Sequence, residues 1–429
     1  MIAKIVLDKK REGRALGSAE IREFIDLFTK GIIPDYQMSA LAMAICCRGM
    51  NERETADLTE AMMRSGECLD WPFASADKHS TGGVGDKLSL VVQPLAAACG
   101  VHVPSLTGRG LGLTGGTADK LESIPGYNAS LSLAEFRRVV SETGVSMTVQ
   151  TAEITPADKK LYALRDVTGT VASIPLIVSS ILSKKLAEGA SALVFDVKCG
   201  RGAFMKTPAE AHELAAALVA GAKAAGRRAV ALVTDMNAPL GCAVGNANEV
   251  AEAISLLKGE RGGADVELCI ELAAWMVALA LPMELENARE LCRTRLADGS
   301  AFAKFEAMVV RHGGNLARFA ELRERPTFKF RIQAMRSGYI TAIDAEKVAR
   351  AALALGAGRL AAGDRIDPLA GVTLAVGVGT KVVAGAPLAT LERSGDPDGL
   401  EKCAAELMKA FVIGSQPPPT GSLILETIT

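Results

Sequence analysis

The sequence predicts an α/β protein with a small discontinuous helical domain, a larger α/β domain with a mainly parallel mixed sheet, and a C-terminal α+β domain. Two patterns carry this prediction. Residues 18–66 have helical periodicity, whereas from Lys78 onward short apolar runs without polar alternation alternate with helical segments, which is typical of parallel strands covered on both faces. The 429 residues are enough for about three domains of ~150 residues each.

The helical domain is expected over residues 1–70 and 156–190. Ser18 is a candidate N-cap for the helix that follows it, and Gly31 is a candidate stop. The helical stretch that begins at Pro156 interrupts the strand–helix alternation, so we expect it to pack against the N-terminal helices.

The α/β domain is expected over residues 71–155 and 191–328, and the C-terminal domain over residues 329–429. In the α/β domain, candidate strands cover residues 145–149, 192–197 and 229–233, with a helix over 208–225 completing the layer. In the C-terminal domain, strand patterns are separated by candidate turns at Gly379-Thr380 and Ala384-Gly385.

Composition excludes several classes of protein. The chain has 48 Lys+Arg and 49 Asp+Glu, a net charge of −1, which gives no basic surface for a nucleic-acid partner. The longest apolar stretch, Leu272–Met283, is too short to span a bilayer, and the N-terminus has no signal-peptide core. The nine cysteines are scattered without zinc-site spacing, so we expect reduced thiols in a cytoplasmic protein with no membrane association.

The segment from Lys78 to Ser89, KHSTGGVGDKLS, contains three glycines, three hydroxyls, two lysines and a histidine before an apolar helical run. Glycines let backbone N–H groups approach an anion, and a helix N-terminus adds partial positive charge. The segment cannot be aligned with a Walker A loop. We interpret it as an anion cradle; the alternative is a glycine-rich turn with solvated hydroxyls.

A second glycine-rich segment, residues 107–120, contains a formal GxGxxG at Gly110, Gly112 and Gly115. An NAD-dependent oxidoreductase would also need an acidic residue ~20 positions further on, at the end of the second strand, and neither Glu122 nor Glu135 fits. Two such loops so close together indicate one small tetrahedral anion held from two sides.

A third segment places a hydroxyl and an ammonium on one helix face. Ser180 and Lys184 are four residues apart, and Arg165 offers a planar fork to carbonyl oxygens. No acidic residue lies between Thr168 and Ala187, which leaves Lys184 and Lys185 without a neutralising partner nearby in the sequence and favours ligand binding. The alternative is a solvated helix face.

Together these segments resemble the pyrimidine-nucleoside phosphorylase and thymidine phosphorylase family. The resemblance runs over nearly the whole chain, through KHSTGGVGDK, GRGLGLTGGTADKLESIPG, PADKKLYALRDVTGTVASIPLI, SKKLAEG and DMNAPLG. The PADKKLYALRDVT and PLGCAVGNA stretches and the ETIT ending are more similar to the broad-specificity pyrimidine enzyme than to the strict thymidine enzyme, which stays the alternative.

The resemblance implies reversible phosphorolysis of uridine, thymidine or deoxyuridine to free base and (deoxy)ribose 1-phosphate, by a homodimer without an organic cofactor. It assigns phosphate binding to Lys78, His79, Ser80, Ser89, Ser105, Leu106, Thr107 and Thr117. It assigns substrate binding to Tyr162, Arg165, Ser180 and Lys184, with His79, Arg165 and Lys184 as catalytic residues. It assigns a monovalent cation (K⁺) site to Gly85, Lys87, Leu240, Ala243 and Glu252.

By the same resemblance, His79 is the leading candidate to protonate the departing base, since an unperturbed histidine pKa of ~6.5 allows either role near neutral pH. The chain departs from the family pattern at Leu113, where His is usual, and at Thr107, which replaces Ser and keeps the hydroxyl. Lys87 stands where some relatives have Thr at the cation site, which leaves two alternatives: backbone carbonyls still bind the ion, or the Lys87 ammonium supplants it.

Two rival functions remain open on the sequence. A phosphoribosyltransferase of similar architecture would need a pyrophosphate and magnesium site, but no paired acidic cluster lies beside the glycine-rich loops. A non-catalytic nucleoside binder is suggested only by Leu113.

Overall fold

A computed structural model describes residues 2–110, 115–151, 153–359, 364–419 and 421–429. Six helices form a bundle in which segments from two parts of the chain share one apolar core. Phe24 and Phe28 from the first part pack in this core with Leu161 and Leu176 from the second. The helices are α1 (Ile2–Arg11), α2 (Ser18–Thr29), α3 (Asp35–Arg48), α4 (Glu52–Met63), α8 (Pro156–Thr168) and α9 (Ile174–Ala187).

Local sequence explains the ends of these helices. Asn51 caps α4 and Glu54 completes a capping box, each accepting the other residue's backbone N–H. The prediction that Ser18 caps α2 is wrong by one position: Gly17 is the N-cap, and its N–H donates to the Glu20 carboxylate three residues on.

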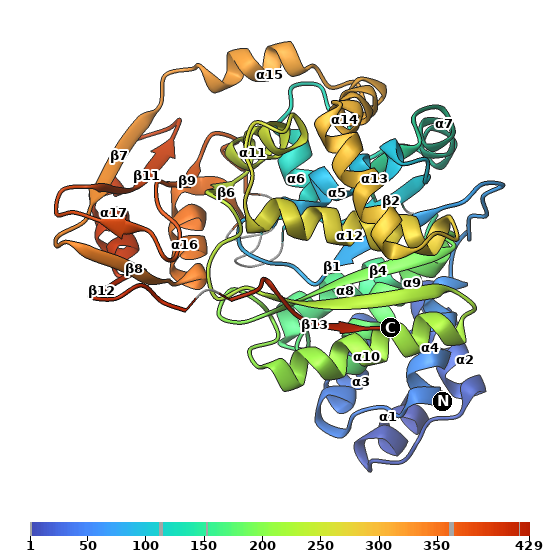
Figure 1. Cartoon of the computed structure of the whole chain (residues 1–429). Helices are drawn as coiled ribbons and strands as arrows, with labels where there is room; N and C mark the ends of the chain where they lie inside the picture. The colour runs from blue at the N-terminus through green and yellow to red at the C-terminus, as the bar shows by residue number, and fades with distance from the viewer. Residues whose placement is uncertain (1, 111–114, 152, 360–363, 420) are drawn as a thin grey trace.

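A mixed, mainly parallel sheet forms the middle of the molecule (Figure 1). Its strands are β1 (Ala76–Ser80), β4 (Ala192–Cys199), β5 (Arg228–Asp235) and β13 (Ile424–Ile428), in the order β1-β4-β5-β13. The first three are parallel, and β13 is antiparallel to β5. A parallel pair, β2 (Val103–Thr107) and β3 (Val145–Val149), extends beyond β1 through a bridge between Ser75 and His102.

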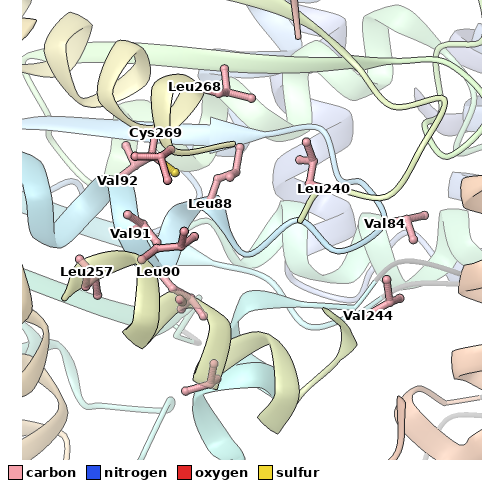
Figure 2. Packing of buried hydrophobic residues seen from close by; sticks show 14 of the residues in the cluster. Val84, Leu88, Leu90, Val91, Val92, Leu240, Val244, Leu257, Leu268 and Cys269 are labelled. Carbon is pink, nitrogen blue, oxygen red and sulfur yellow. The ribbon is translucent and has the colours of Figure 1, made fainter. Parts of the chain in front are cut away.

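Helices cover both faces of this sheet, which explains why its strands lack polar alternation. On one face, α9 and α10 (Pro208–Ala224) pack on β4 and β5. On the other, α5 (Leu88–Ala98) and α12 (Ala264–Ala280) pack on β1 and β4. Figure 2 shows this second layer, where Leu90 and Val91 of α5 lie near Leu257. The outer helices are α6 (Thr117–Glu122), α7 (Leu133–Thr143), α11 (Ala247–Leu257), α13 (Leu285–Ala297), α14 (Ser300–Arg311) and α15 (Leu316–Arg323).

The C-terminal region forms two small sheets at one end of the molecule, away from α1–α4 (Figure 1). The strand orders are β6-β9-β11-β7 and β10-β8-β12. The elements are β6 (Ala243–Gly245), β7 (Phe328–Gln333), β8 (Gly338–Ile343), α16 (Ala345–Ala352), a π-helical turn (Leu353–Ala357), β9 (Gly371–Leu374), β10 (Lys381–Val382), β11 (Pro387–Arg393), α17 (Leu400–Met408) and β12 (Phe411–Gly414).

Two strands cross the boundaries expected from the sequence. β13, expected in the C-terminal domain, pairs with β5 of the central sheet, and β6, expected in the α/β domain, pairs with β9. The sequence of a single edge strand does not indicate which sheet the strand joins, because its partner is set by tertiary packing. Among the described residues, no helix is long and apolar enough to cross a membrane.

Candidate active site

One cavity of about 560 Å³ lies where the carboxyl ends of β1 and β2 face α8 and α9. All twelve residues predicted to bind phosphate or substrate line it. The phosphate set, on β1, β2 and the starts of α5 and α6, is Lys78, His79, Ser80, Ser89, Ser105, Leu106, Thr107 and Thr117. The substrate set, on α8 and α9, is Tyr162, Arg165, Ser180 and Lys184.

Lys78 is a fixed positive charge on the phosphate side of the cavity. Its ammonium lies 3.0 Å from the Asp196 carboxylate and 3.5 Å from the Ser89 hydroxyl in the first turn of α5. Burial alone would lower the pKa of Lys78, but Asp196 and Asp86 raise it above the ordinary value, so the side chain stays charged. The charge therefore faces an incoming anion beside a helix N-terminus.

Asp196 organises the buried charges behind Lys78. Its carboxylate lies 2.8 Å from the Lys198 ammonium and accepts a hydrogen bond of 2.6 Å from Thr234. Asp196 and Lys198 lie within β4, and both are fully buried. The ammonium groups of Lys78 and Lys198 both contact the same oxygen, Oδ2, of this carboxylate.

Several of the cavity's hydroxyls already have partners. Ser80 donates a hydrogen bond of 2.5 Å to Asp86. Burial would raise the pKa of Asp86, but Lys78, Lys198 and Lys120 lower it well below the ordinary value, so Asp86 is a carboxylate and accepts this bond. Ser105 accepts a hydrogen bond of 2.8 Å from Gln93.

His79 is neutral near neutral pH in the ligand-free protein. Burial and the neighbouring charges of Lys185, Lys184 and Lys78 hold its pKa well below the ordinary value. The expectation that His79 titrates near 6.5 is therefore wrong. A neutral imidazole still offers one N–H donor and one acceptor.

On the opposite wall, Lys184 and Ser180 share a face of α9 as their spacing predicts. The Lys184 ammonium donates to the Ser180 hydroxyl at 2.8 Å and to the Asp158 carboxylate of α8 at 2.6 Å. It lies 5.6 Å from the centre of the Tyr162 ring. Burial lowers the pKa of Lys184, and Asp158 opposes that shift.

The lysines of α9 find acidic partners outside the interval 168–187. Lys184 pairs with Asp158, and Lys185 pairs with Asp77 of β1 and, at 3.0 Å, with Glu188. These carboxylates come from outside the interval that the sequence argument considered. Lys184 and its partner Asp158 both line the cavity.

Arg165 is buried and has most of its donors engaged. Its guanidinium donates to the backbone carbonyls of Thr170, Val171 and Leu176 at 3.1, 2.7 and 2.9 Å. Of five N–H donors, three are used in this way, so two remain for a ligand. Arg165 therefore also fixes the segment between α8 and α9.

A buried ionic network connects the two walls. Lys185 of α9 contacts Asp77 of β1 and donates to the Leu106 carbonyl of β2 at 3.0 Å. The Leu106 N–H donates to Glu188 at 3.2 Å, so this N–H has a partner within the protein. Burial and Asp77 raise the pKa of Glu188 well above its ordinary value. Helix α9 is thus tied to β1 and β2, the strands that carry most of the predicted phosphate set.

The five residues predicted to hold a monovalent cation also come together, but they do not fit an ion. The Lys87 ammonium lies inside the set, 2.6 Å from the Leu240 carbonyl and 2.8 Å from the Glu252 carboxylate. Lys87 is almost completely buried. Two of the oxygens that would bind the ion therefore already bind a cation.

Part of the second glycine-rich segment lies outside the described residues, including Leu113 and Gly112. Gly110 and Gly115 line the cavity. The Gly110 N–H donates to Asp119 at 2.7 Å, and Arg109 lies 3.2 Å from the same carboxylate. Gly110 is thus held by α6 without a nucleotide, which gives the GxGxxG match a structural role in this loop.

Comparisons with known proteins identify the family of each part of the chain. Residues 74–302 match the model of the glycosyl transferase family α/β domain, and residues 4–66 match its helical bundle domain. Residues 339–414 match the pyrimidine nucleoside phosphorylase C-terminal domain. The chain is also similar in fold to anthranilate phosphoribosyltransferase from Thermus thermophilus, with a TM-score of 0.60 over 72% of this chain and 99% of the other, at 22% identity.

Curated relatives are much closer in sequence. A pyrimidine-nucleoside phosphorylase of Geobacillus stearothermophilus is 45% identical over 99% of both chains. A pyrimidine-nucleoside phosphorylase of Bacillus subtilis is 48% identical over 90% of both chains. Identity at this level over nearly full length shows common family membership, and the chain belongs to the pyrimidine-nucleoside phosphorylase family of glycosyl transferases.

Proposed function

We propose that the chain catalyses reversible phosphorolysis of pyrimidine nucleosides, giving the free base and (deoxy)ribose 1-phosphate. The observation that carries this proposal is that a hydroxyl-rich, cationic wall and a Ser180–Lys184 wall face each other across one cavity. Substrates of the class are uridine, deoxyuridine and thymidine; strict use of thymidine is the narrower alternative. The fold likeness to a phosphoribosyltransferase supports the architecture alone.

On the phosphate side, Lys78 and the hydroxyls of Ser89, Thr107 and Thr117 hold the nucleophile. Breaking an N-glycosidic bond builds positive charge on the sugar, and a phosphate held beneath the anomeric carbon stabilises that charge and attacks it. Asp196 keeps Lys78 charged and in place without occupying the cavity itself.

On the base side, Lys184 and Ser180 hold the pyrimidine carbonyl edge, and the two remaining donors of Arg165 assist. These donors stabilise the negative charge that develops on the departing base. His79 supplies an N–H from a neutral imidazole, and a bound phosphate dianion raises its affinity for a proton when the base leaves.

Closure of the α8–α9 wall over the phosphate wall assembles the site and excludes water, so transfer to phosphate wins over hydrolysis. We further propose that the protein is a homodimer located in the cytoplasm. Size-exclusion chromatography with light scattering tests the dimer, and a monomeric mass contradicts it.

The test of the reaction is incubation with uridine, deoxyuridine and thymidine, each with and without inorganic phosphate. Loss of ultraviolet absorbance follows release of the base. Release that requires phosphate supports the proposal, and the ratio of kcat/KM values separates broad from strict specificity. Binding without release indicates a nucleoside binder, and magnesium-dependent binding of phosphoribosyl pyrophosphate indicates a transferase.

A further inference from the structure

Lys87 is a buried positive charge that takes no part in the proposed chemistry. It is the N-cap of α5, next to the glycine-rich phosphate segment, and only 1% of its side chain is exposed. It is not among the described residues that line the cavity. Burying a charge is costly unless the charge is paired and hydrogen-bonded, so the partners of Lys87 must account for its burial.

The ammonium of Lys87 lies in a cage to which two separate segments contribute oxygens, the loop at Leu240 and helix α11 at Glu252. It donates to the Leu240 carbonyl at 2.6 Å and pairs with Glu252 at 2.8 Å. The carbonyls of Leu240 and Ala243 converge on Gly85, where an added Cβ would lie 2.7 and 3.0 Å from them. Figure 2 shows Leu240 on the loop that passes between Val84 and Leu88, the two ends of this turn.

The neighbouring described residues pack closely around this ammonium. The loop closes over it at Gly241, where an added Cβ would lie 2.8 Å from the Lys87 Nζ and 2.5 Å from a Glu252 oxygen. Glu252 also accepts the backbone N–H groups of Cys242 and Ala243, at 2.8 and 2.7 Å. The Leu240 and Glu252 oxygens that would coordinate an ion therefore already have partners.

The charges of the cage are also balanced without an ion. Glu252 is paired with both Lys87 and Arg261, and Arg261 lies 2.9 Å from Asp265. Two cations thus face two carboxylates in a largely buried cluster. A further K⁺ would add an uncompensated buried charge, which is unfavourable.

We infer that Lys87 is an internal replacement for the monovalent cation that the family resemblance implies at this place, so that this chain does not use K⁺. An ammonium carries the same charge as K⁺ and is of similar size, and here it is attached to the loop that it stabilises. It joins the turn before α5 to residues 240–243 and to α11 at Glu252. The inference does not depend on the proposed reaction, because it concerns the stability of this turn.

Thermal unfolding of the full chain in potassium chloride and in choline chloride, at equal ionic strength, tests the inference. The unchanged protein is expected to have the same Tm in both salts. Lys87→Thr vacates the cage and supplies an oxygen, so its Tm in choline falls by roughly 5 °C or more. Potassium should restore this Tm in a saturable manner, as expected for a ligand of the folded state.

Lys87→Met is the matched control, because it removes the charge while filling the space. Its Tm should fall as far as that of Lys87→Thr and should not recover in potassium. A saturable rise of the unchanged protein's Tm with K⁺ would overturn the inference, as would a folded Lys87→Thr variant that ignores K⁺. If Lys87→Thr does not fold, the unchanged protein in the two salts still decides.

Discussion

Substituting Lys78 by methionine should weaken phosphate binding far more than nucleoside binding. The substitution removes the buried ammonium beside Ser89 and keeps the length of the side chain. A hydrogen bond to a charged group contributes about 1.5–3 kcal/mol. Loss of the bond between the Lys78 ammonium and bound phosphate should therefore raise the KM for phosphate roughly 10- to 100-fold. The KM for the nucleoside should change little, since Lys78 lies on the wall opposite Lys184.

Lys198→Met is a matched control for this experiment. Lys198 pairs with the same carboxylate, Asp196, at 2.8 Å against 3.0 Å for Lys78, and both side chains are fully buried. Lys198, however, is not among the described residues that line the cavity.

Both variants leave Asp196 with one ammonium and with the Thr234 hydroxyl. Each should therefore lose less stability than the ~3–5 kcal/mol of an unpaired buried charge. Initial rates at varied phosphate and saturating uridine give the KM values, and urea unfolding gives the stabilities. An equal rise of the phosphate KM in both variants would refute the assignment, since the effect would then come from the shared carboxylate.

Three further predictions follow from the same contacts. Lys184→Met should raise the nucleoside KM about 10-fold or more and leave the phosphate KM unchanged. Lys159 is exposed and also lines the cavity, and its substitution Lys159→Met should change neither KM. Similar changes in both KM values for Lys184→Met would argue against its role. His312 is buried and its pKa is lowered to about 4, so the free energy of unfolding should decrease by up to about 3 kcal/mol as pH falls from about 6.5 toward 4. His312→Asn should lack this decrease, and urea unfolding at several pH values measures it. Glu188 has a raised pKa, so over a range of pH it is protonated in the folded state and ionised in the unfolded chain. The free energy of unfolding should therefore decrease as pH rises above about 4.5. Glu188→Gln should fold and lack this decrease, and failure of this variant to fold would contradict a neutral side chain.

The residues that line the two walls of the cavity stand out in the sequence because each wall is built from a local pattern. The glycine-rich segment after Lys78 and the spacing of Ser180 and Lys184 fix backbone geometry within a few residues. The family resemblance then assigned residues from separate segments to one site, and the cavity contains all twelve. Parallel strands open their carboxyl ends on one side, which explains why β1 and β2 contribute together.

The electrostatic partners could not be predicted in the same way. Asp196 lies 118 positions from Lys78, and Asp158 lies on a different helix from Lys184. Such pairs depend on tertiary packing, which a window of sequence does not contain. The pKa of His79 depends on three lysines brought near by that packing, so its ordinary value was a poor guide. A charged residue within an otherwise apolar strand, such as Asp196, is the signal that could have indicated a buried partner.

A crystal structure with phosphate and a pyrimidine base bound together tests the two-walled cavity most directly. Phosphate should lie against Lys78, Ser89 and Thr107, and the base carbonyl edge should lie against Ser180 and Lys184. Phosphate bound at the α8–α9 wall, or a base bound outside this cavity, would contradict the assignment of the two walls.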